Sequence, residues 1–302
     1  MVKLPNNVDV NNLIDDLRIL CWEAADILLY YSKTLKDDNL KSSIIKNKDS
    51  FDPVTLADLE VNDLILQKMQ INYPDISWKY LSEENVKVDP YHYNIDSDWL
   101  WVLDPLDGTR DFIQGTGEYA MHFALNYKNK PFLGFVLIPE KEELWISSGV
   151  DVWCEQRDRN KRKSSLQIKG NLSDMTLVRS KNHSNQILTD LIEKINFEKV
   201  TVMGSIGCKI ASIVRGESDI YISLSLPGKT SPKDWDFAAP EIILKTAGGA
   251  ITNLDNKDLI YGQNRFEQGG IIVASNNKEL HKNICLEIKE IILRNNLYQL
   301  ND

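Results

Sequence analysis

Two aspartates that follow an apolar run are the residues of this sequence best suited to chemistry. Residues 101–103 are apolar and favour a β-strand that leads directly to Asp104. Pro105 has no N–H group to donate and therefore ends the strand, and Asp107 precedes a glycine with which it favours a turn. Both carboxylates and the carbonyl of Leu106 would then face one space. Hard oxygen ligands of this kind suit Mg²⁺, although the same residue pairs also occur in surface turns that bind nothing.

Other acidic residues stand where a helix or a loop explains them equally well. Thr55 and Asp58 are spaced as a capping box at the start of a predicted helix. Glu83 and Glu84 are adjacent like charges, which is typical of a solvated loop. Asp236 lies in the first turn of another predicted helix, where the helix dipole favours an anion. The local sequence therefore leaves both a structural and a functional role open for these carboxylates.

A short glycine-containing segment, residues 204–209, joins a predicted strand to a predicted helix. Its small residues allow the backbone to approach a ligand closely, and the N–H groups at a helix N-terminus suit phosphate. The spacing does not match the phosphate-binding loop GxxxxGK[ST]. Ser205 and Lys209 are therefore candidate phosphate contacts that the start of a helix would also explain.

The composition excludes some classes of protein. The 302 residues include 35 Lys and Arg against 44 Asp and Glu, which gives a formal net charge of −9. A protein that binds nucleic acid electrostatically would instead carry a concentrated basic face. The four cysteines form no CxxC pair, so we expect reduced thiols. The sequence shows neither a signal peptide nor a run of about 20 apolar residues, and we therefore predict a cytoplasmic protein that does not enter a membrane.

The predicted elements change in kind along the chain. Helices are expected at residues 9–33 and 56–70, where apolar residues recur at helical spacing. Short β-rich segments separated by turn residues follow. We therefore predict an α+β domain at residues 1–165 and an α/β domain at residues 166–302. In the second domain we expect strands at 175–179, 200–203, 219–223 and 271–274, and helices at 187–195, 209–215, 237–246 and 278–294.

The basic block at residues 157–163 is expected at the tip of a hairpin between strands at 151–154 and 166–168. It contains no aromatic residue on which a base could stack. A solvated turn is therefore favoured over a site that binds a polyanion.

Taken in their order, the acidic segments resemble the motifs of the inositol monophosphatase superfamily, whose members are Mg²⁺-dependent, lithium-sensitive phosphatases. The resemblance extends from about residue 10 to residue 275, and the DPLDGT segment is highly specific for it. The matching segments are PVTLAD at 53–58, SEE at 82–84, DPLDGT at 104–109, WD at 235–236 and AGG at 247–249.

Within this superfamily the chain looks most similar to the 3′(2′),5′-bisphosphate nucleotidases. The segments that carry this likeness are TRDF at 109–112, GEY at 117–119, SKNH at 180–183 and WDFAAPE at 235–241. The chain also departs from the pattern, because Gly207 and Cys208 replace a serine pair before Lys209 and residues 227–233 align ambiguously. These departures concern the identity of the substrate more than the chemistry.

The resemblance implies a layered αβαβα sandwich that holds two Mg²⁺ ions, with room for a third, looser ion near Glu83. Glu83, Asp104 and the carbonyl of Leu106 would hold one ion. Asp104, Asp107 and Asp236 would hold the second. The N-terminal domain would thus carry most of the metal ligands, and the C-terminal domain would carry the last one together with the substrate contacts.

The resemblance also implies catalytic and substrate-binding roles. Thr109, oriented by Asp58 and with Glu83 nearby, would activate the metal-bound water. The N–H groups of Gly108 and Thr109 would cradle the phosphate. His183, Ser205 and Lys209 would hold the nucleoside and its second phosphate. Asp107 and Asp236 are the other implied substrate contacts.

The implied reaction is hydrolysis of the 3′-phosphate of adenosine 3′,5′-bisphosphate to AMP and phosphate, a step of sulfur metabolism. Two alternatives stay open: an inositol or broad sugar-phosphate phosphatase, similar to the fructose-1,6-bisphosphatases, and an inactive sensor of nucleotides or metal. A sensor would be expected to lack Asp58, Thr109 or a ligand carboxylate, and all are present. The sequence does not distinguish a monomer from a homodimer.

The net negative charge of the chain does not exclude a small phosphate ester as substrate. Five of the negative charges belong to the proposed site, and bound Mg²⁺ ions would offset them. The net charge therefore speaks against a nucleic acid polymer only.

Overall fold

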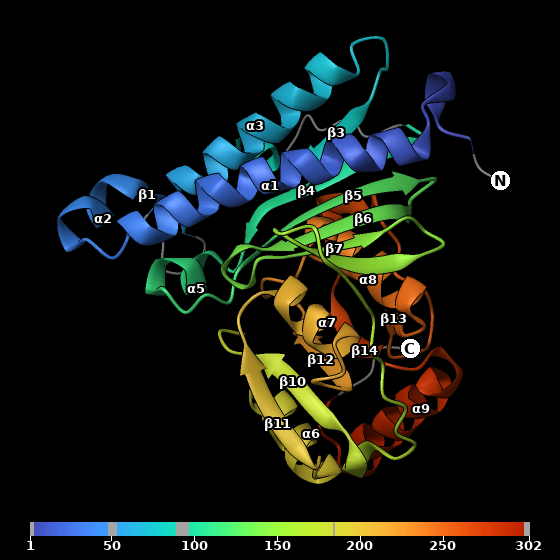
Figure 1. Cartoon of the computed structure of the whole chain (residues 1–302). Coiled ribbons are helices and arrows are strands. Elements are labelled where there is room, and N and C mark those ends of the chain that lie inside the picture. Colours follow the sequence, from blue (N-terminus) through green and yellow to red (C-terminus); the bar gives the residue numbers. More distant parts are fainter. Residues whose placement is uncertain (1–2, 48–52, 89–96, 184, 299–302) are drawn as a thin grey trace.

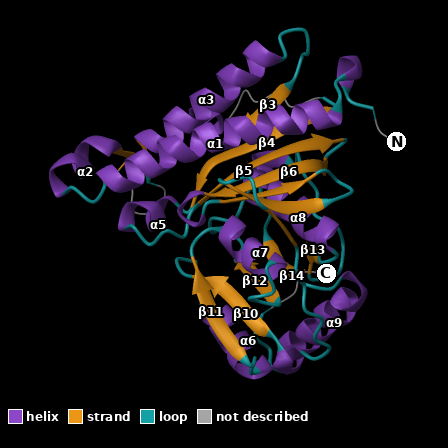
Figure 2. Ribbon diagram, in the orientation of Figure 1, coloured by secondary structure: helices purple, strands orange, loops and turns teal. Residues whose placement is uncertain are grey.

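The helices and strands form five layers, in which two large sheets alternate with three layers of helices (Figure 1, Figure 2). The computed structural model describes residues 3–47, 53–88, 97–183 and 185–298. The layering confirms the predicted αβαβα sandwich. No helix in these ranges is both long and apolar enough to cross a membrane.

Two long helices, α1 (Val10–Thr34) and α3 (Leu56–Asn72), cover the outer face of the first sheet (Figure 1). Asp9 caps α1 by accepting hydrogen bonds from the N–H groups two and three residues later. The apolar side chains that recur at helical spacing along α1, from Leu13 to Leu28, are buried against the sheet. Both helices lie where the periodicity of the sequence predicts them.

The first sheet contains, among the described residues, seven strands in the order β3-β4-β5-β6-β7-β8-β9. β3 and β4 run parallel, and every other neighbouring pair is antiparallel. The strands are β3 (Lys79–Ser82), β4 (Trp99–Asp107), β5 (Ala120–Tyr127), β6 (Lys130–Ile138), β7 (Glu143–Ser147), β8 (Val152–Gln156) and β9 (Lys161–Lys163).

The side chains of β4 alternate between the two faces of this sheet. Trp101 and Leu103 pack in the core under α1 and α3, whereas Leu100 and Val102 pack in the core toward the second half of the chain. The same alternation directs the next residue, Asp104, to the inner face.

The middle layer consists of α7 (Ile206–Val214) and α8 (Asp234–Ala247). α8 contacts β4, β5 and β6 of the first sheet and β13 of the second. Every residue of α7 is buried. These two helices therefore join the two sheets.

The second sheet has the described strand order β11-β10-β12-β14-β13. β10 runs parallel to β11 and β12, and β14 runs antiparallel to β12 and β13. The outer layer is formed by α6 (Gln186–Ile195) and α9 (Lys278–Arg294). The strands are β10 (Thr176–Ser180), β11 (Lys199–Met203), β12 (Ile220–Ser225), β13 (Ala250–Asn253) and β14 (Gly270–Ser275).

Several short elements do not follow from the sequence analysis, because a segment of two to seven residues shows no periodicity. Besides β3 and β13, they are α2 (Asp38–Ile44), β1 (Ile45–Asn47), β2 (Val54–Thr55), α4 (Glu83–Val88) and α5 (Thr109–Gln114). α4 also replaces the solvated loop expected at Glu83 and Glu84. These two acidic residues instead begin a helix, where its dipole favours them.

The basic hairpin is shorter than predicted. The strand expected at residues 166–168 is wrong, because β9 lies within the basic block itself and pairs with β8. The turn is closed earlier, by Asp158, whose carboxylate accepts a hydrogen bond from the N–H of Asn160. β9 is an edge strand made of basic residues, a composition that discourages pairing with another chain.

The chain passes from the first sheet to the second between β9 and β10, near the predicted domain boundary at residue 165. The division into two domains stays a prediction. α7 and α8 belong to the second half of the chain but contact strands of both sheets.

Gly134 on β6 allows α8 to approach the sheet, and this position gives a test of the packing. A Cβ atom there would lie 2.3 Å from Cγ2 of Ile242 and 3.1 Å from the carbonyl oxygen of Ala239. We expect Gly134→Ala to lower the free energy of unfolding by about 1–3 kcal/mol, because it overpacks a filled space. Urea denaturation followed by tryptophan fluorescence measures this change.

Gly170→Ala is the matched control, because a Cβ atom there would have no neighbour within 4 Å. We expect it to change the free energy of unfolding by less than about 0.5 kcal/mol. Equal effects of the two variants would contradict the close packing of α8 on β6.

Candidate active site

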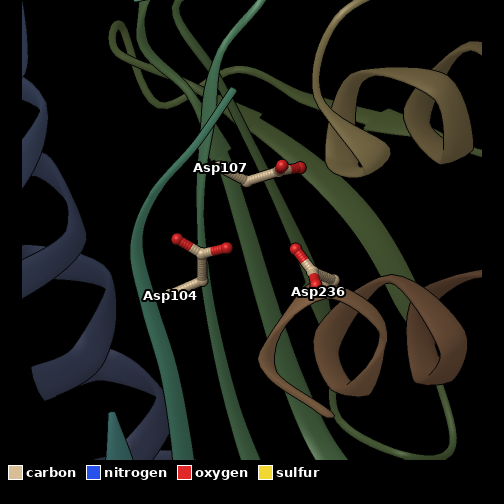
Figure 3. Close-up of side chains that lie close together, drawn as sticks. All are labelled: Asp104, Asp107 and Asp236. Carbon is tan, nitrogen blue, oxygen red and sulfur yellow. The ribbon is translucent and has the colours of Figure 1, made fainter. Parts of the chain in front are cut away.

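Three aspartates from β4 and α8 converge between the first sheet and the middle layer (Figure 3). Asp104, Asp107 and Asp236 each offer one carboxylate oxygen, and these oxygens all lie within 4.8 Å of one another. We call these residues the aspartate cluster. Its hard oxygen donors are ligands of the type that Mg²⁺ takes, and the cluster could hold a metal ion.

A β-bulge at the end of β4 brings the first two carboxylates to the same face. Asp104 pairs with His122 of β5, and Asp107 pairs with Ala120, so β4 has one residue more than its partner between these pairs. In a regular strand, residues three apart point to opposite faces. The extra residue in β4 removes this difference, so both aspartates face the middle layer (Figure 3).

Asp236 is held at the start of α8 by its own helix. One of its carboxylate oxygens accepts a hydrogen bond of 2.5 Å from the N–H of Lys233, three residues earlier. This contact completes the N-terminal cap of α8. Asp236 therefore has the structural role that the sequence left open, because it caps its helix. The cap also fixes its carboxylate beside those of Asp104 and Asp107.

Glu83 reaches the aspartate cluster through the parallel pairing of β3 with β4. Ser82 pairs with Leu103, so the next residues of the two strands, Glu83 and Asp104, are neighbours. The Glu83 carboxylate also forms an ion pair of 2.9 Å with Lys87, one turn later in α4. Its predicted role as a metal ligand stays a prediction.

The electrostatics of the cluster fit a bound cation. Burial, followed by the charges of Glu83 and Asp107, raises the pKa of Asp104 well above its usual value. Desolvation and the charges of Asp107 and Glu83 likewise raise the pKa of Asp236. Negative charges forced together in this way repel one another, and a divalent cation would relieve the repulsion. The donors and their charges therefore fit Mg²⁺.

Asp107 also caps the N-terminus of α7. Its Oδ2 atom accepts hydrogen bonds from the hydroxyl of Ser205 at 2.6 Å and from the N–H groups of Ile206 at 2.5 Å and Gly207 at 3.3 Å. An anion at this place is favoured by the helix dipole. Ser205 thus contacts the aspartate cluster directly.

His122 is a site residue that the sequence analysis missed. It is 1% exposed, its Nδ1 atom lies 3.3 Å from the carbonyl oxygen of Trp235, and its Nε2 atom lies 3.3 Å from Oδ2 of Asp107. Burial lowers the pKa of this histidine, although the charge of Asp107 opposes the shift. The available signal was a histidine within the mostly apolar strand β5, which also contains the buried polar residue Asn126.

Lys209 is a buried residue in the first turn of α7. Its ammonium group donates a hydrogen bond to the carbonyl of Gly204 and lies 5.3 Å from the centre of the Tyr221 ring. Burial lowers its pKa. Both Lys209 and Ser205 therefore have partners within the protein, and their predicted substrate contacts stay predictions.

Thr109 and Asp58 meet next to the aspartate cluster. The hydroxyl of Thr109 lies 3.1 Å from the carbonyl oxygen of Leu106 and 3.4 Å from Oδ1 of Asp58. The other oxygen of Asp58 accepts hydrogen bonds from the N–H and hydroxyl groups of Thr55, which is the predicted capping box. Burial raises the pKa of Asp58 to about 7, against these hydrogen bonds. A carboxylate with such a pKa can take up and release a proton near neutral pH.

Gly108 makes the turn into α5 possible. Its φ angle is +87°, in the left-handed region, and a Cβ atom would lie 3.0 Å from the carbonyl oxygen of Glu118. The residue therefore places Thr109 at the start of α5, beside Asp58. The proposed cradle of N–H groups for a phosphate stays a prediction.

His183 lies in the turn after β10, in the second half of the chain. Its N–H group donates a hydrogen bond to the hydroxyl of Ser180. The residue is exposed, but its ring is partly desolvated within the turn. This desolvation, followed by the charges of Lys209 and Arg110, lowers its pKa. Two basic side chains and the carboxylate of Asp107, which opposes the shift, therefore act electrostatically on His183.

Comparisons with known proteins point to one family. Residues 11–293 match the family model described as the inositol monophosphatase family. Two curated relatives are named 3′(2′),5′-bisphosphate nucleotidase CysQ. The one from Salmonella typhimurium is 29% identical over 226 residues, which cover 74% of this chain and 85% of the relative. The one from Buchnera aphidicola is 30% identical over 211 residues, which cover 69% of this chain and 74% of the relative.

Solved structures share the fold. An inositol monophosphatase from Anabaena superposes with a TM-score of 0.70 at 21% identity, over 94% of this chain and 97% of that chain. The Thermotoga maritima IMPase superposes with a TM-score of 0.68 at 20% identity, over 94% and 99% of the two chains. At these identities the structural likeness shows the fold alone.

The aspartate cluster predicts opposite effects of one substitution with and without metal. Asp236→Asn removes one of the repelling charges, so at pH 8 we expect the metal-free variant to be more stable than the metal-free wild type. Mg²⁺ at 100 times its Kd should stabilise the wild type by about 2.7 kcal/mol and should leave the variant nearly unchanged. Thermal unfolding with EDTA or with Mg²⁺ measures both effects.

Asp234→Asn is the matched control for this test. Asp234 is a buried carboxylate two residues away on α8, but it binds the N–H of Gly262 and the amide of Gln268. We expect this variant to keep its response to Mg²⁺. Loss of the response in both variants would contradict a metal site at the aspartate cluster.

The raised pKa of Asp58 predicts a stability that depends on pH. The folded protein binds this proton more tightly than the unfolded chain, in which the pKa of an aspartate is near 3.9. The proton therefore stabilises the fold at pH 4, and this stability is lost as the pH rises through about 7. Asp58→Asn has no such loss, so its stability relative to the wild type should increase from pH 4 to pH 8.

Urea denaturation of the metal-free proteins at several pH values measures this difference. A difference between variant and wild type that stays constant across the range would contradict the raised pKa.

Proposed function

The chain belongs to the inositol monophosphatase family, and we propose that it acts there as a Mg²⁺-dependent 3′(2′),5′-bisphosphate nucleotidase. In this proposal it hydrolyses adenosine 3′,5′-bisphosphate to AMP and phosphate. The observation that carries the proposal is the convergence of Asp104, Asp107 and Asp236 next to the pair formed by Thr109 and Asp58. The family and the named relatives support a phosphoric monoester hydrolase. The nucleotide as substrate is our inference from the names of the relatives and from the TRDF and SKNH segments.

The aspartate cluster, with Glu83 and the carbonyl of Leu106, would hold Mg²⁺, which supplies charge neutralisation for the phosphoryl group and acidifies water. The chain's own residues would then orient the reactants. The hydroxyl of Thr109 lies 3.4 Å from Oδ1 of Asp58, so when it donates to this carboxylate it can accept a hydrogen bond from the attacking water and pass its own proton to Asp58. Asp58 can hold the proton that this water loses, because its pKa is close to 7.

The reaction balances with water alone. The water oxygen forms a bond to phosphorus, the bond between phosphorus and the ribose 3′ oxygen breaks, and that oxygen takes up a proton. No covalent intermediate with the protein is needed. This agrees with general phosphoryl transfer, which needs positioning and charge stabilisation more than a nucleophilic side chain.

Selection of a nucleotide would depend on the second half of the chain. His183 lies near the positive charges of Arg110 and Lys209, which suits a substrate with a second anionic group. Ser205 and Lys209 are bonded within the protein. A substrate that contacts these two side chains would have to exchange or share those hydrogen bonds.

The proposal includes further properties of the enzyme. We propose two Mg²⁺ ions, a third and looser ion near Glu83, and inhibition by lithium. We also propose a cytoplasmic location and a role in sulfur metabolism. The four cysteines are all buried and unpaired, which suits a reducing compartment.

A substrate panel tests the proposed function. In the presence of Mg²⁺ we expect the kcat/KM for phosphate release from adenosine 3′,5′-bisphosphate to exceed those for inositol 1-phosphate and fructose 1,6-bisphosphate by at least about tenfold, about 1.4 kcal/mol of transition-state discrimination. Millimolar lithium should lower the rate. Colorimetric detection of phosphate measures all three reactions.

Asp107→Asn is the inactive control for the panel, with its folding checked by circular dichroism. Best activity on inositol 1-phosphate or on the sugar bisphosphate would refute the nucleotidase and support the corresponding alternative. Binding of the nucleotide without phosphate release from any substrate would support an inactive sensor.

A further inference from the structure

Asp111 is a fully buried carboxylate for which the proposed chemistry has no use. It lies on α5, two residues after Thr109, and its exposed fraction is 0%. Its Oδ1 atom accepts a hydrogen bond from the hydroxyl of Thr116 at 2.9 Å and faces the ammonium group of Lys181 at 3.1 Å. Its Oδ2 atom accepts a hydrogen bond of 2.7 Å from the side-chain amide of Asn182. Two of these three partners come from the turn after β10.

The same carboxylate touches the turn that leads into α7. A Cβ atom on Gly204 would lie 2.4 Å from Oδ2 of Asp111 and 2.6 Å from the carbonyl oxygen of Glu118, so only glycine fits there. The N–H group of Lys181 donates a hydrogen bond of 3.0 Å to the carbonyl of Met203, which precedes this glycine. Asp111 therefore lies where two turns of the second half of the chain meet α5 of the first half.

The chemistry of these contacts requires a carboxylate. All three partners are hydrogen-bond donors, and a carboxylate offers two acceptor oxygens with about four lone-pair sites. An asparagine would present its own N–H₂ group to one of these donors. A buried charge is stable only when it is paired and hydrogen-bonded, and Lys181 supplies the pairing here.

The turn held by Asp111 carries a predicted substrate contact. His183 directly follows Asn182, and the basic side chains of Arg110 and Lys209 act electrostatically on its ring. Ser205, which caps α7 and binds Asp107, directly follows Gly204. A shift of the two turns would therefore move His183 relative to the basic side chains around it. The candidate metal ligands on β4, Asp104 and Asp107, would stay in place.

We propose that Asp111 is a positioning residue that fixes the turns at residues 181–183 and 204–205 and thereby sets the affinity for a substrate with a second anionic group. This inference rests on the proposed function for the identity of the substrate. Asp111 does not touch the aspartate cluster in the described contacts, so it should affect binding of the second anionic group and leave the rate of the chemical step unchanged.

Two substrates that differ in a single phosphate test the proposal. Adenosine 3′,5′-bisphosphate and adenosine 3′-monophosphate present the same reacting group, but only the first has a second anionic group. In Asp111→Asn we expect the KM for the bisphosphate to rise about tenfold, the effect of losing one charged hydrogen bond. The KM for the monophosphate and both kcat values should stay within about twofold of the wild type.

A double variant tests whether the hydrogen bond itself is responsible. Asp111→Asn combined with Asn182→Asp exchanges donor and acceptor across the same contact and keeps a negative charge beside Lys181. We expect it to restore the KM for the bisphosphate to within about threefold of the wild type. Failure of this rescue, with the fold intact, would contradict positioning through the Asn182 contact.

Glu155→Gln is the matched control. Glu155 is also a buried, ion-paired carboxylate, but its partners are Arg18 and Trp22 of α1, on the opposite side of the first sheet. We expect this variant to lower stability without changing the ratio of the two KM values. An equal change of that ratio in both variants would mean that Asp111 acts through general stability.

Hydrogen exchange measured by mass spectrometry gives a readout that needs no substrate. In Asp111→Asn the amides of residues 181–183 and 204–206 should exchange about tenfold faster, whereas those of β4 should not change. Unchanged exchange, or a KM that rises equally for both substrates, would overturn the proposal. If the wild type shows no preference for the bisphosphate, the proposed function fails, and hydrogen exchange still decides whether Asp111 holds the two turns.

Discussion

The repulsion among the carboxylates of the aspartate cluster is the constraint on which the rest of the structure depends. Burial and neighbouring negative charges raise the pKa of Asp104 and of Asp236, so their ionised forms are unfavourable without a cation. Isolated carboxylates would turn apart toward water. Here the bulge of β4 and the cap of α8 hold them together, and the stability of five packed layers offsets the cost.

The protein itself neutralises part of this charge. The N-terminus of α7 binds Asp107 through two N–H groups and the hydroxyl of Ser205. Lys209 lies in the first turn of α7, where its buried ammonium group donates a hydrogen bond to the carbonyl of Gly204. The middle layer of helices is therefore an electrostatic support for the site as well as the joint between the two sheets.

The sequence predicts most of the fold and the three residues of the aspartate cluster, for identifiable reasons. Long elements such as α1 and α9 have clear periodicity, and the Asp-Gly pair marks the end of β4. The strand end predicted at Pro105 is wrong, because β4 continues through Pro105 to Asp107 at a bulge, where a proline is tolerated. Two features depend on pairing between distant strands and do not follow from local sequence patterns. The neighbourhood of Glu83 and Asp104, which follows from the register of β3 with β4, is implied only by the family resemblance, and the position of His122 beside Asp107 is not predicted at all. The predicted strand at 166–168 failed because three basic residues just before it satisfy the pairing with β8.

The position of α8 in the middle layer has a consequence for how the chain folds. β4, β5 and β6 are made early in synthesis, but the helix that covers their inner face, with Ala124, Gly134 and Val136, comes much later in the chain. Contacts of such long sequence separation form slowly, and the apolar face of the first sheet stays open to wrong partners until α8 arrives. The contact that completes the aspartate cluster is the same one that closes this face. A metal ion held by all three aspartates would therefore bind only after the two halves of a newly made chain have come together.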